Sequence, residues 1–158
     1  MIRKLAAAAF ALGLMAAPLH AAEKISTPVE VEANEMEIID ADKQAIFRGK
    51  VNAVRGSQII KSDVMTVFYA DVKQPDGTTK SQASKLDAKG NVTITTRKQV
   101  ITGEWAKMDI LANSLLVGGK VKLTEGKTTL QGEKLTVDLT TERTLMTGGR
   151  VKGSFVPK

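Results

Sequence analysis

The chain has no cysteine and one histidine, His20, among its 158 residues. Without cysteine there are no disulfides, thiolate metal sites or cysteine nucleophiles. Aromatic residues make up only 4% of the chain, too few for clustered base-stacking platforms of the kind that bind single-stranded nucleic acid. After residue 17, no apolar run approaches the roughly 20 residues that a membrane-spanning helix needs. Few of the usual routes to a catalytic or metal centre therefore remain.

The first 22 residues have the layout of a secretory signal peptide. Arg3 and Lys4 provide a positive start, an uncharged apolar run follows, and a proline and small residues come before the expected cleavage site. We expect a signal peptide at residues 1–21 and a single domain at residues 22–158, because the chain is short. An uncleaved membrane anchor is the alternative.

Cleavage would also remove His20, so the exported chain would contain neither cysteine nor histidine. Ser-His-Asp triads and His-ligated zinc would then be excluded, leaving only carboxylate, lysine or tyrosine chemistry. The carboxylates in Asp40-Ala41-Asp42-Lys43 could serve as a calcium pair or in glycoside hydrolysis, but we interpret this stretch as a turn between strands. Export without a later anchor or cysteine fits a bacterial periplasm.

Two motifs recur four times in the same order, with a period of about 29 residues. The first reads apolar, polar, small, acidic or Asn, any, apolar, polar, apolar, and the second is Gly-x-Val. One spacing of 41 residues marks an insertion at residues 71–82, where Pro75-Asp76-Gly77 predicts a turn. The first motif lies at residues 31–38, 60–67, 101–108 and 130–137, and the second at Gly49-Lys50-Val51, Gly90-Asn91-Val92, Gly119-Lys120-Val121 and Gly149-Arg150-Val151.

Apolar and polar residues alternate within each repeat, so that Val31 and Ala33 would face one way and Glu32 the other. No helical stripe of apolar residues is sustained, and Thr, Val and Ile are abundant, so we expect a nearly all-β fold. The alternation slips once in each first motif, where Ala33 and Met36 lie three residues apart. Such a slip indicates a bulge or corner. Each repeat should therefore form short strands joined by corners that stack on the next repeat.

A sheet with one apolar face must cover that face, either with its own side chains or with an apolar ligand. Many of the positions that we assign to the inner face are small, including Ala33, Gly49, Ala53 and Gly90. An interior with so little bulk favours a groove or a very flat core. For each inward apolar residue, plain core packing is the alternative to ligand binding.

The leader, the four repeats and the opening Val-Glu-Val-Glu-Ala-Asn-Glu-Met at residues 29–36 together resemble the OstA-like family. The resemblance extends from Pro28 to about Val151, with Asn34 where the family usually has Asp. It implies a single open antiparallel β-jellyroll, a solenoid-like stack of about four repeats with an apolar interior groove. It also implies a non-enzymatic periplasmic carrier, without cofactor or metal, that binds lipopolysaccharide. Its partners would be an LptC-like inner-membrane protein, an LptD-like outer-membrane protein and further copies of itself.

Under this resemblance, the inward apolar residues would contact the acyl chains of lipid A, and the basic balance of the chain, +6, would suit an anionic amphiphile. Nucleic acid is not expected as a partner after export. Two other functions stay open, a ligand-free structural β-solenoid polymer and a small polysaccharide-acting enzyme on a β-helix. The candidate lipid-binding residues are Val31, Met36, Ile38, Phe47, Val51, Ile60, Met65, Val92, Ile94, Met108 and Val121.

The two ends of such a stack would have unpaired backbone groups. Glu30 and Glu32 make the first edge acidic, whereas Arg150 and Lys152 make the last edge basic. Opposite charges favour joining unlike ends, which generates filaments. The alternative is that both edges are simply solvated. The candidate edge residues for copies and partners are Val29, Val31, Arg150, Val151, Lys152 and Phe155.

Overall fold

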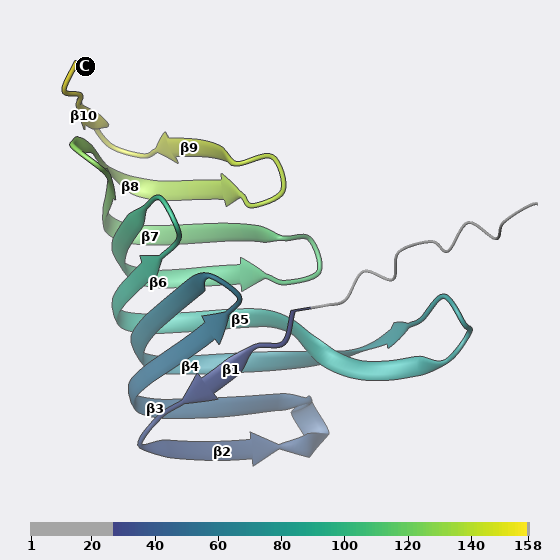
Figure 1. Cartoon of the computed structure of the whole chain (residues 1–158). Helices are drawn as coiled ribbons and strands as arrows, with labels where there is room; N and C mark the ends of the chain where they lie inside the picture. Colours follow the sequence, from purple (N-terminus) through teal and green to yellow (C-terminus); the bar gives the residue numbers. More distant parts are fainter. Residues whose placement is uncertain (1–26, 158) are drawn as a thin grey trace, which may run out of the picture.

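A computed structural model describes residues 27–157 (Figure 1), and the predicted signal peptide lies outside this range. The described chain forms ten strands and one short 3-10 helix, which confirms the all-β prediction. None of its helices is long and apolar enough to cross a membrane. The elements are β1 (Glu30–Glu32), β2 (Glu35–Ile39), η1 (Asp40–Asp42), β3 (Gln44–Arg55), β4 (Gln58–Lys73), β5 (Thr79–Thr95), β6 (Val100–Asp109), β7 (Ser114–Glu125), β8 (Thr128–Asp138), β9 (Arg143–Thr147) and β10 (Lys152–Ser154).

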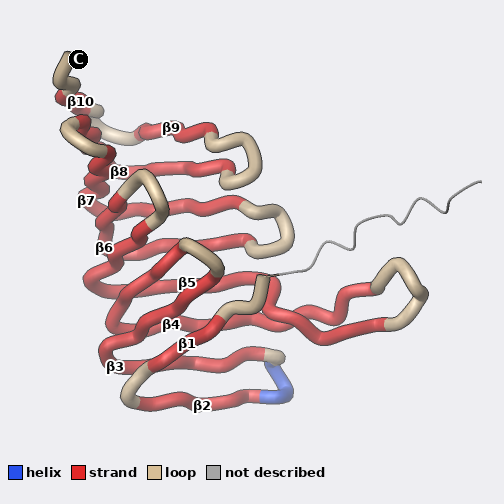
Figure 2. Tube along the Cα trace, in the orientation of Figure 1, coloured by secondary structure: helices blue, strands red, loops and turns tan. Residues whose placement is uncertain are grey.

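All ten strands belong to one open antiparallel sheet, which folds over on itself because each strand from β3 to β8 bends midway (Figure 2). The bend divides the sheet into two walls. Wall 1 contains β1, one half of β3 to β8, and β10, whereas wall 2 contains β2, the other halves, and β9. We number the eight rows of each wall from row 1 (β1 and β2) through β3 to β8 to row 8 (β10 and β9).

The bends are built by the two recurring motifs together. Gly49 and Lys50 both have positive φ, +80° and +48°, which the absence of a side chain makes easy at the glycine. A Cβ on Gly49 would lie 2.8 Å from Asn34 Nδ2, and the Asn34 N–H donates to the Gly49 carbonyl at 3.0 Å. Likewise, a Cβ on Gly90 would lie 2.5 Å from Asp63 Oδ2. The acidic or Asn position of one motif therefore lies over the glycine of the next, which explains why the motifs recur as a pair.

The fourth corner differs from the prediction by one residue. Gly148 and Gly149, rather than Gly149 and Arg150, take the positive φ values, +83° and +60°. Arg150 is then an additional residue before Val151, whose Cγ2 still lies 3.5 Å from the place of a Cβ on Gly132. The motif pointed to Gly149 because only Gly149-Arg150-Val151 reads Gly-x-Val, whereas the structure has one additional residue between the corner and Val151.

Opposite the corners, each wall ends in turns, and we call this side the mouth. Wall 2 has three equivalent four-residue turns, each ending in a left-handed residue: Lys43 (φ 49°), Asn113 (φ 53°) and Glu142 (φ 57°). The interpretation of Asp40-Ala41-Asp42-Lys43 as a turn is thus confirmed. The fourth connection in wall 2 is the predicted insertion, an extended β4–β5 hairpin that projects from the body (Figure 1).

The inner faces of the walls pack directly on each other. Met65, Val117 and Leu135 have 0% of their surface exposed, and residues of rows 2 to 7 form one hydrophobic core. Of the two ways to cover the apolar face, the chain uses its own side chains. Gly49 and Gly90 do not leave room inside, as we had supposed, because they serve the corners.

Candidate functional site: the interior and its two open ends

Cross-strand pairing aligns the inward residues into columns that run from row 1 to row 8. One column of wall 2 is Met36, Phe47, Met65, Ala88, Ala106, Val117, Leu135 and Met146. One column of wall 1 is Val31, Ala53, Ile60, Ile94, Ile101, Leu123, Leu130 and Gly153. Because these columns face each other across the core, the interior is a continuous apolar track along the stack.

The structure places most of the predicted lipid-binding residues in this track. Val31 is half-buried and packs against the core. The fully buried members of the predicted set are Phe47, Val51, Ile60, Met65, Val92, Ile94, Met108 and Val121.

Met36 and Ile38 are exceptions, with 59% and 62% of their surface exposed. They pair with Phe47 and Ala45 and so share their inward phase, but they lie in row 1, where no further strand covers them. Both residues thus have the inward phase that the sequence predicts, and their contact with acyl chains stays a prediction.

Sequence reasoning missed other members of the track that are equally buried. The signal for them was available, because the alternation that includes Met65 continues to Val67, and the one that includes Val121 continues to Leu123. The main additions are Val67, Leu86, Ile101, Leu115, Val117, Leu123 and Leu135.

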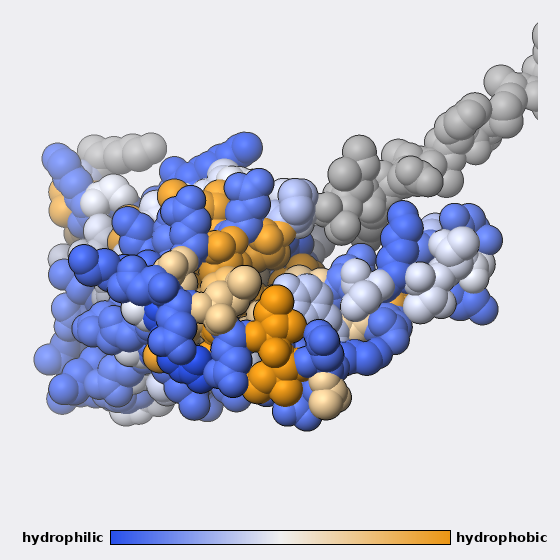
Figure 3. Space-filling model, turned by 90° about the horizontal axis from the view of Figure 1, so that it is seen from below, coloured by the Kyte–Doolittle hydropathy of each residue, from blue (hydrophilic) through white to orange (hydrophobic). Residues whose placement is uncertain are grey.

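At the N-terminal end, apolar surface gathers in the middle and hydrophilic residues form the rim (Figure 3). A cavity of about 270 Å³ opens there beneath the β4–β5 hairpin, lined by Ile38, Ala45 and Tyr69 among others. At its edge, Lys43 forms an ion pair with Asp71 of the hairpin. The track is therefore accessible at this end.

Each open end presents two edge strands rather than the one that we predicted. β1 and β10 are edges, as expected, but β2 and β9 are the edges of wall 2. Arg150 and Val151 precede β10 instead of lying within it, and Phe155 follows it with 70% of its surface exposed. The prediction was incomplete because a corner separates the two strands of each end.

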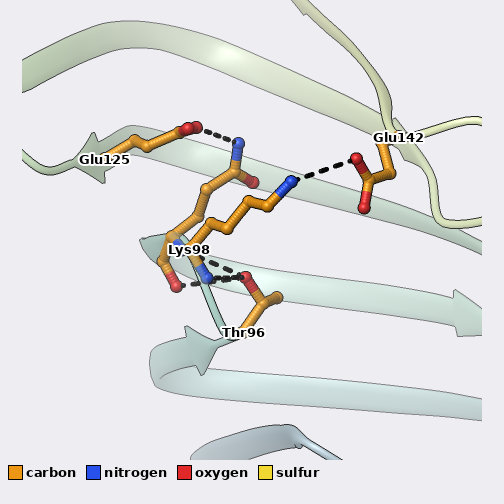
Figure 4. A network of polar contacts seen from close by, with 5 residues as sticks. Thr96, Lys98, Glu125 and Glu142 are labelled. Atoms are coloured by element: carbon orange, nitrogen blue, oxygen red, sulfur yellow. Dashed lines mark hydrogen bonds and ion pairs between the residues drawn. The ribbon is translucent and has the colours of Figure 1, made fainter.

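Two polar contacts join the walls across the mouth. Arg55 Nη1 of wall 1 donates to Asn113 Oδ1 of wall 2 at 3.1 Å. Lys98 Nζ lies 3.3 Å from Glu142 Oε2, next to Glu125, which accepts from Gln99 Nε2 at 2.8 Å (Figure 4). The mouth is thus closed by a few polar contacts, whereas at the corners the backbone itself connects the two walls.

Among residues 27–157 no group of three His, Asp or Glu side chains could hold a metal ion.

An open antiparallel sheet, folded into two walls around an apolar track with free ends, defines an extended β-jellyroll. Residues 30–143 match the family model described as "LptA/(LptD N-terminal domain) LPS transport protein", and the chain belongs to this family. The resemblance stated from the motifs is therefore confirmed. Proteins of this family transport lipopolysaccharide and are not enzymes.

Two individual proteins illustrate the similarity. The chain is 28% identical over 134 residues to the uncharacterized protein R00383 of Rhizobium meliloti (strain 1021), covering 83% of this chain and 72% of that one. Its fold is similar to that of LptH, described as the LptA-homologous periplasmic component of the lipopolysaccharide transport device of Pseudomonas aeruginosa. The TM-score is 0.70 and the identity 16%, over 83% of this chain and 96% of LptH.

Proposed function

We propose that the chain is a periplasmic carrier and bridge, which binds the acyl chains of lipopolysaccharide between its two walls. It would receive the lipid from an LptC-like inner-membrane protein and pass it to an LptD-like protein in the outer membrane. The predicted signal peptide at residues 1–21 would deliver it to the periplasm. The observation that carries the proposal is the continuous apolar track, which runs along a stack whose two ends are free sheet edges.

Lipid entry requires the walls to separate, because the inner face is packed in the absence of ligand. The walls are hinged at the glycine corners and joined at the mouth by Arg55 and Lys98. Separation would replace contacts among apolar side chains with contacts to acyl chains, so the buried apolar area is retained. The net positive charge favours the phosphates of an anionic amphiphile.

The two ends suit head-to-tail assembly, because strand directions alternate and each wall has an even number of rows. β10 runs from the corner to the mouth and β1 from the mouth to the corner, so β10 of one copy and β1 of the next would pair antiparallel. The same holds for β9 and β2. If the wall 1 column continues from Gly153 of one copy to Val31 of the next, Lys152 would lie beside Glu32 of the next copy. Partners at either membrane would use the same edges by strand addition.

A photo-crosslinking amino acid tests the binding site. Placed at the buried Met65, it should capture lipopolysaccharide, whereas the same probe at the exposed Lys61 on the outer face of the same strand should not. Equal capture at both positions would contradict binding between the walls.

A ligand-free structural polymer is the second candidate, and the tight packing of Met65, Val117 and Leu135 favours it. Oligomers that form without any capture of lipid at Met65 would support this alternative. Deletion of residues 149–158 removes β10 and should leave a folded monomer in analytical ultracentrifugation under either candidate. Unchanged oligomers would show that the C-terminal edge is not the interface.

A further inference from the structure

The two contacts across the mouth share one geometry. Arg55 ends row 2 of wall 1, and its partner Asn113 lies in the turn between rows 5 and 6 of wall 2. Lys98 lies in the turn between rows 4 and 5 of wall 1, and its partner Glu142 in the turn between rows 7 and 8 of wall 2. In both contacts, a residue at a wall 1 turn thus meets the wall 2 turn that lies three rows further along the stack. The offset follows from the inclination of the wall 1 strands to those of wall 2 (Figure 1).

Wall 1 has a third turn of this kind, Gly126-Lys127, between rows 6 and 7. An offset of three rows takes it past row 8, beyond the end of its own wall 2. Figure 1 shows this β7–β8 turn beside β10, at the C-terminal end of the molecule. In a head-to-tail assembly, the place three rows further belongs to the next copy, between its rows 1 and 2. The wall 2 turn at that place is Asp40-Ala41-Asp42-Lys43.

The residues at this predicted junction occupy the same positions as the contact between Arg55 and Asn113. Glu125 is equivalent to Arg55, because each directly precedes the positive-φ glycine of a two-residue turn, Gly126 or Gly56. Lys43 is equivalent to Asn113 by its left-handed place in the turn. Where the contact within the chain joins a cation to an amide, the junction would join an anion to a cation. Both Glu125 and Lys43 are exposed. Within the chain Glu125 accepts a hydrogen bond from Gln99 and Lys43 pairs with Asp71, so a contact with a second copy would add to or replace these surface contacts.

We propose that the contacts between wall 1 turns and wall 2 turns continue from one copy to the next, with Glu125 of one copy paired to Lys43 of the next. This inference rests on the proposed head-to-tail assembly and adds a contact away from the edge strands. The pair would help to set the rotation of one copy about the stack, because β1 and β10 are short, with 3 residues each. It would also keep the apolar track aligned between copies.

Thiol crosslinking tests the geometry directly, because the chain contains no cysteine. Glu125→Cys and Lys43→Cys are made in separate chains, mixed, and treated with a short bismaleimide, since these side chains hold the backbones too far apart for a disulfide. The mixture should give a covalent dimer, and neither variant alone should do so. Arg55→Cys combined with Asn113→Cys in one chain calibrates the reagent and should crosslink within the monomer.

Charge reversal tests the ion pair. Lys43→Glu and Glu125→Lys should each weaken self-association by about three- to tenfold, and a mixture of the two should recover it, as expected for an exposed pair. Lys61→Glu makes the same charge change away from the junction and should leave association unchanged. Oligomers without a crosslinked dimer would overturn the inference and leave the proposed assembly intact. Absence of oligomers in the unmodified chain would overturn both.

Discussion

The middle rows and the end rows carry the same pattern of residues but differ in burial. Met65 in row 3 is completely buried, whereas Met36, two rows away in the same column, is 59% exposed. Leu135 in row 7 is completely buried, whereas Met146, its neighbour in the same column in row 8, is only partly buried. In a stack of rows, burial depends on neighbours on both sides as much as on the residue itself. The ends are therefore unfinished copies of the middle, which is what joining to another chain requires.

The largest expected effect is a difference in the free energy of unfolding between variants of these two methionines. Met65→Ala should reduce the free energy of unfolding by about 2–5 kcal/mol, because it leaves a cavity in a packed core. Met36→Ala should change it by less than about 0.5 kcal/mol in the monomer. Urea denaturation of both variants at low protein concentration measures the difference. Similar losses would mean that Met36 is buried in solution, for instance by a second copy.

Alanine substitutions at two glycines compare the packed body with the projecting hairpin. Gly90 at a corner and Gly77 in the hairpin turn have φ of +80° and +86°, so alanine strains both by about 1–2 kcal/mol. Only Gly90 has a neighbour in contact, Asp63, and nothing lies within 4 Å of a Cβ on Gly77. Gly90→Ala should therefore lower the free energy of unfolding more than Gly77→Ala. Equal costs would mean that the corner relaxes around the new methyl group.

The two contacts across the mouth should differ in strength. Arg55 and Asn113 are half-buried, so Arg55→Ala should reduce the free energy of unfolding by about 1 kcal/mol. The side chains of Lys98 and Glu142 are 66% and 75% exposed, so Lys98→Ala should cost no more than about 0.5 kcal/mol. Repeating both measurements at high salt should erase the smaller effect and spare most of the larger one. A larger loss of unfolding free energy for Lys98→Ala than for Arg55→Ala would mean that Lys98 contributes more than Arg55 to holding the two walls together at the mouth.

The smallest effect concerns the turn at the C-terminal end. The backbone N–H groups of Thr141 and Thr140 donate to the Asp138 carboxylate and lower its pKa below the ordinary value. Its contribution to stability is thus complete above the unfolded pKa and is lost as the pH falls through the folded pKa. The Thr140 and Thr141 amide signals in NMR should titrate in acid with that lowered pKa. In Asp138→Asn this titration should disappear, and a step that persists would belong to another carboxylate.

Much of the fold could be predicted from sequence because each sequence repeat corresponds to a repeated structural unit. The alternation around Val51 and Val92 assigned the inner face, and the insertion at residues 71–82 was located by its spacing. Local patterning did not locate the corner at Gly49, which we had assigned to the inner face. It also failed at the fourth corner, because Gly149-Arg150-Val151 reads Gly-x-Val whereas Gly148 and Gly149 take the positive φ values.

The strand periodicity, the slips that mark corners and the inward residues could be read from the amino-acid sequence, because backbone sterics and alternation are local properties. The packing of the walls on each other, the exposure of Met36 and Ile38, and the two edge strands at each end emerged from the folded structure. It alone revealed the contacts of Arg55 and Lys98 across the mouth. These features depend on the bend and mutual inclination of whole strands, which bring together residues 58 and 44 positions apart that no local pattern connects.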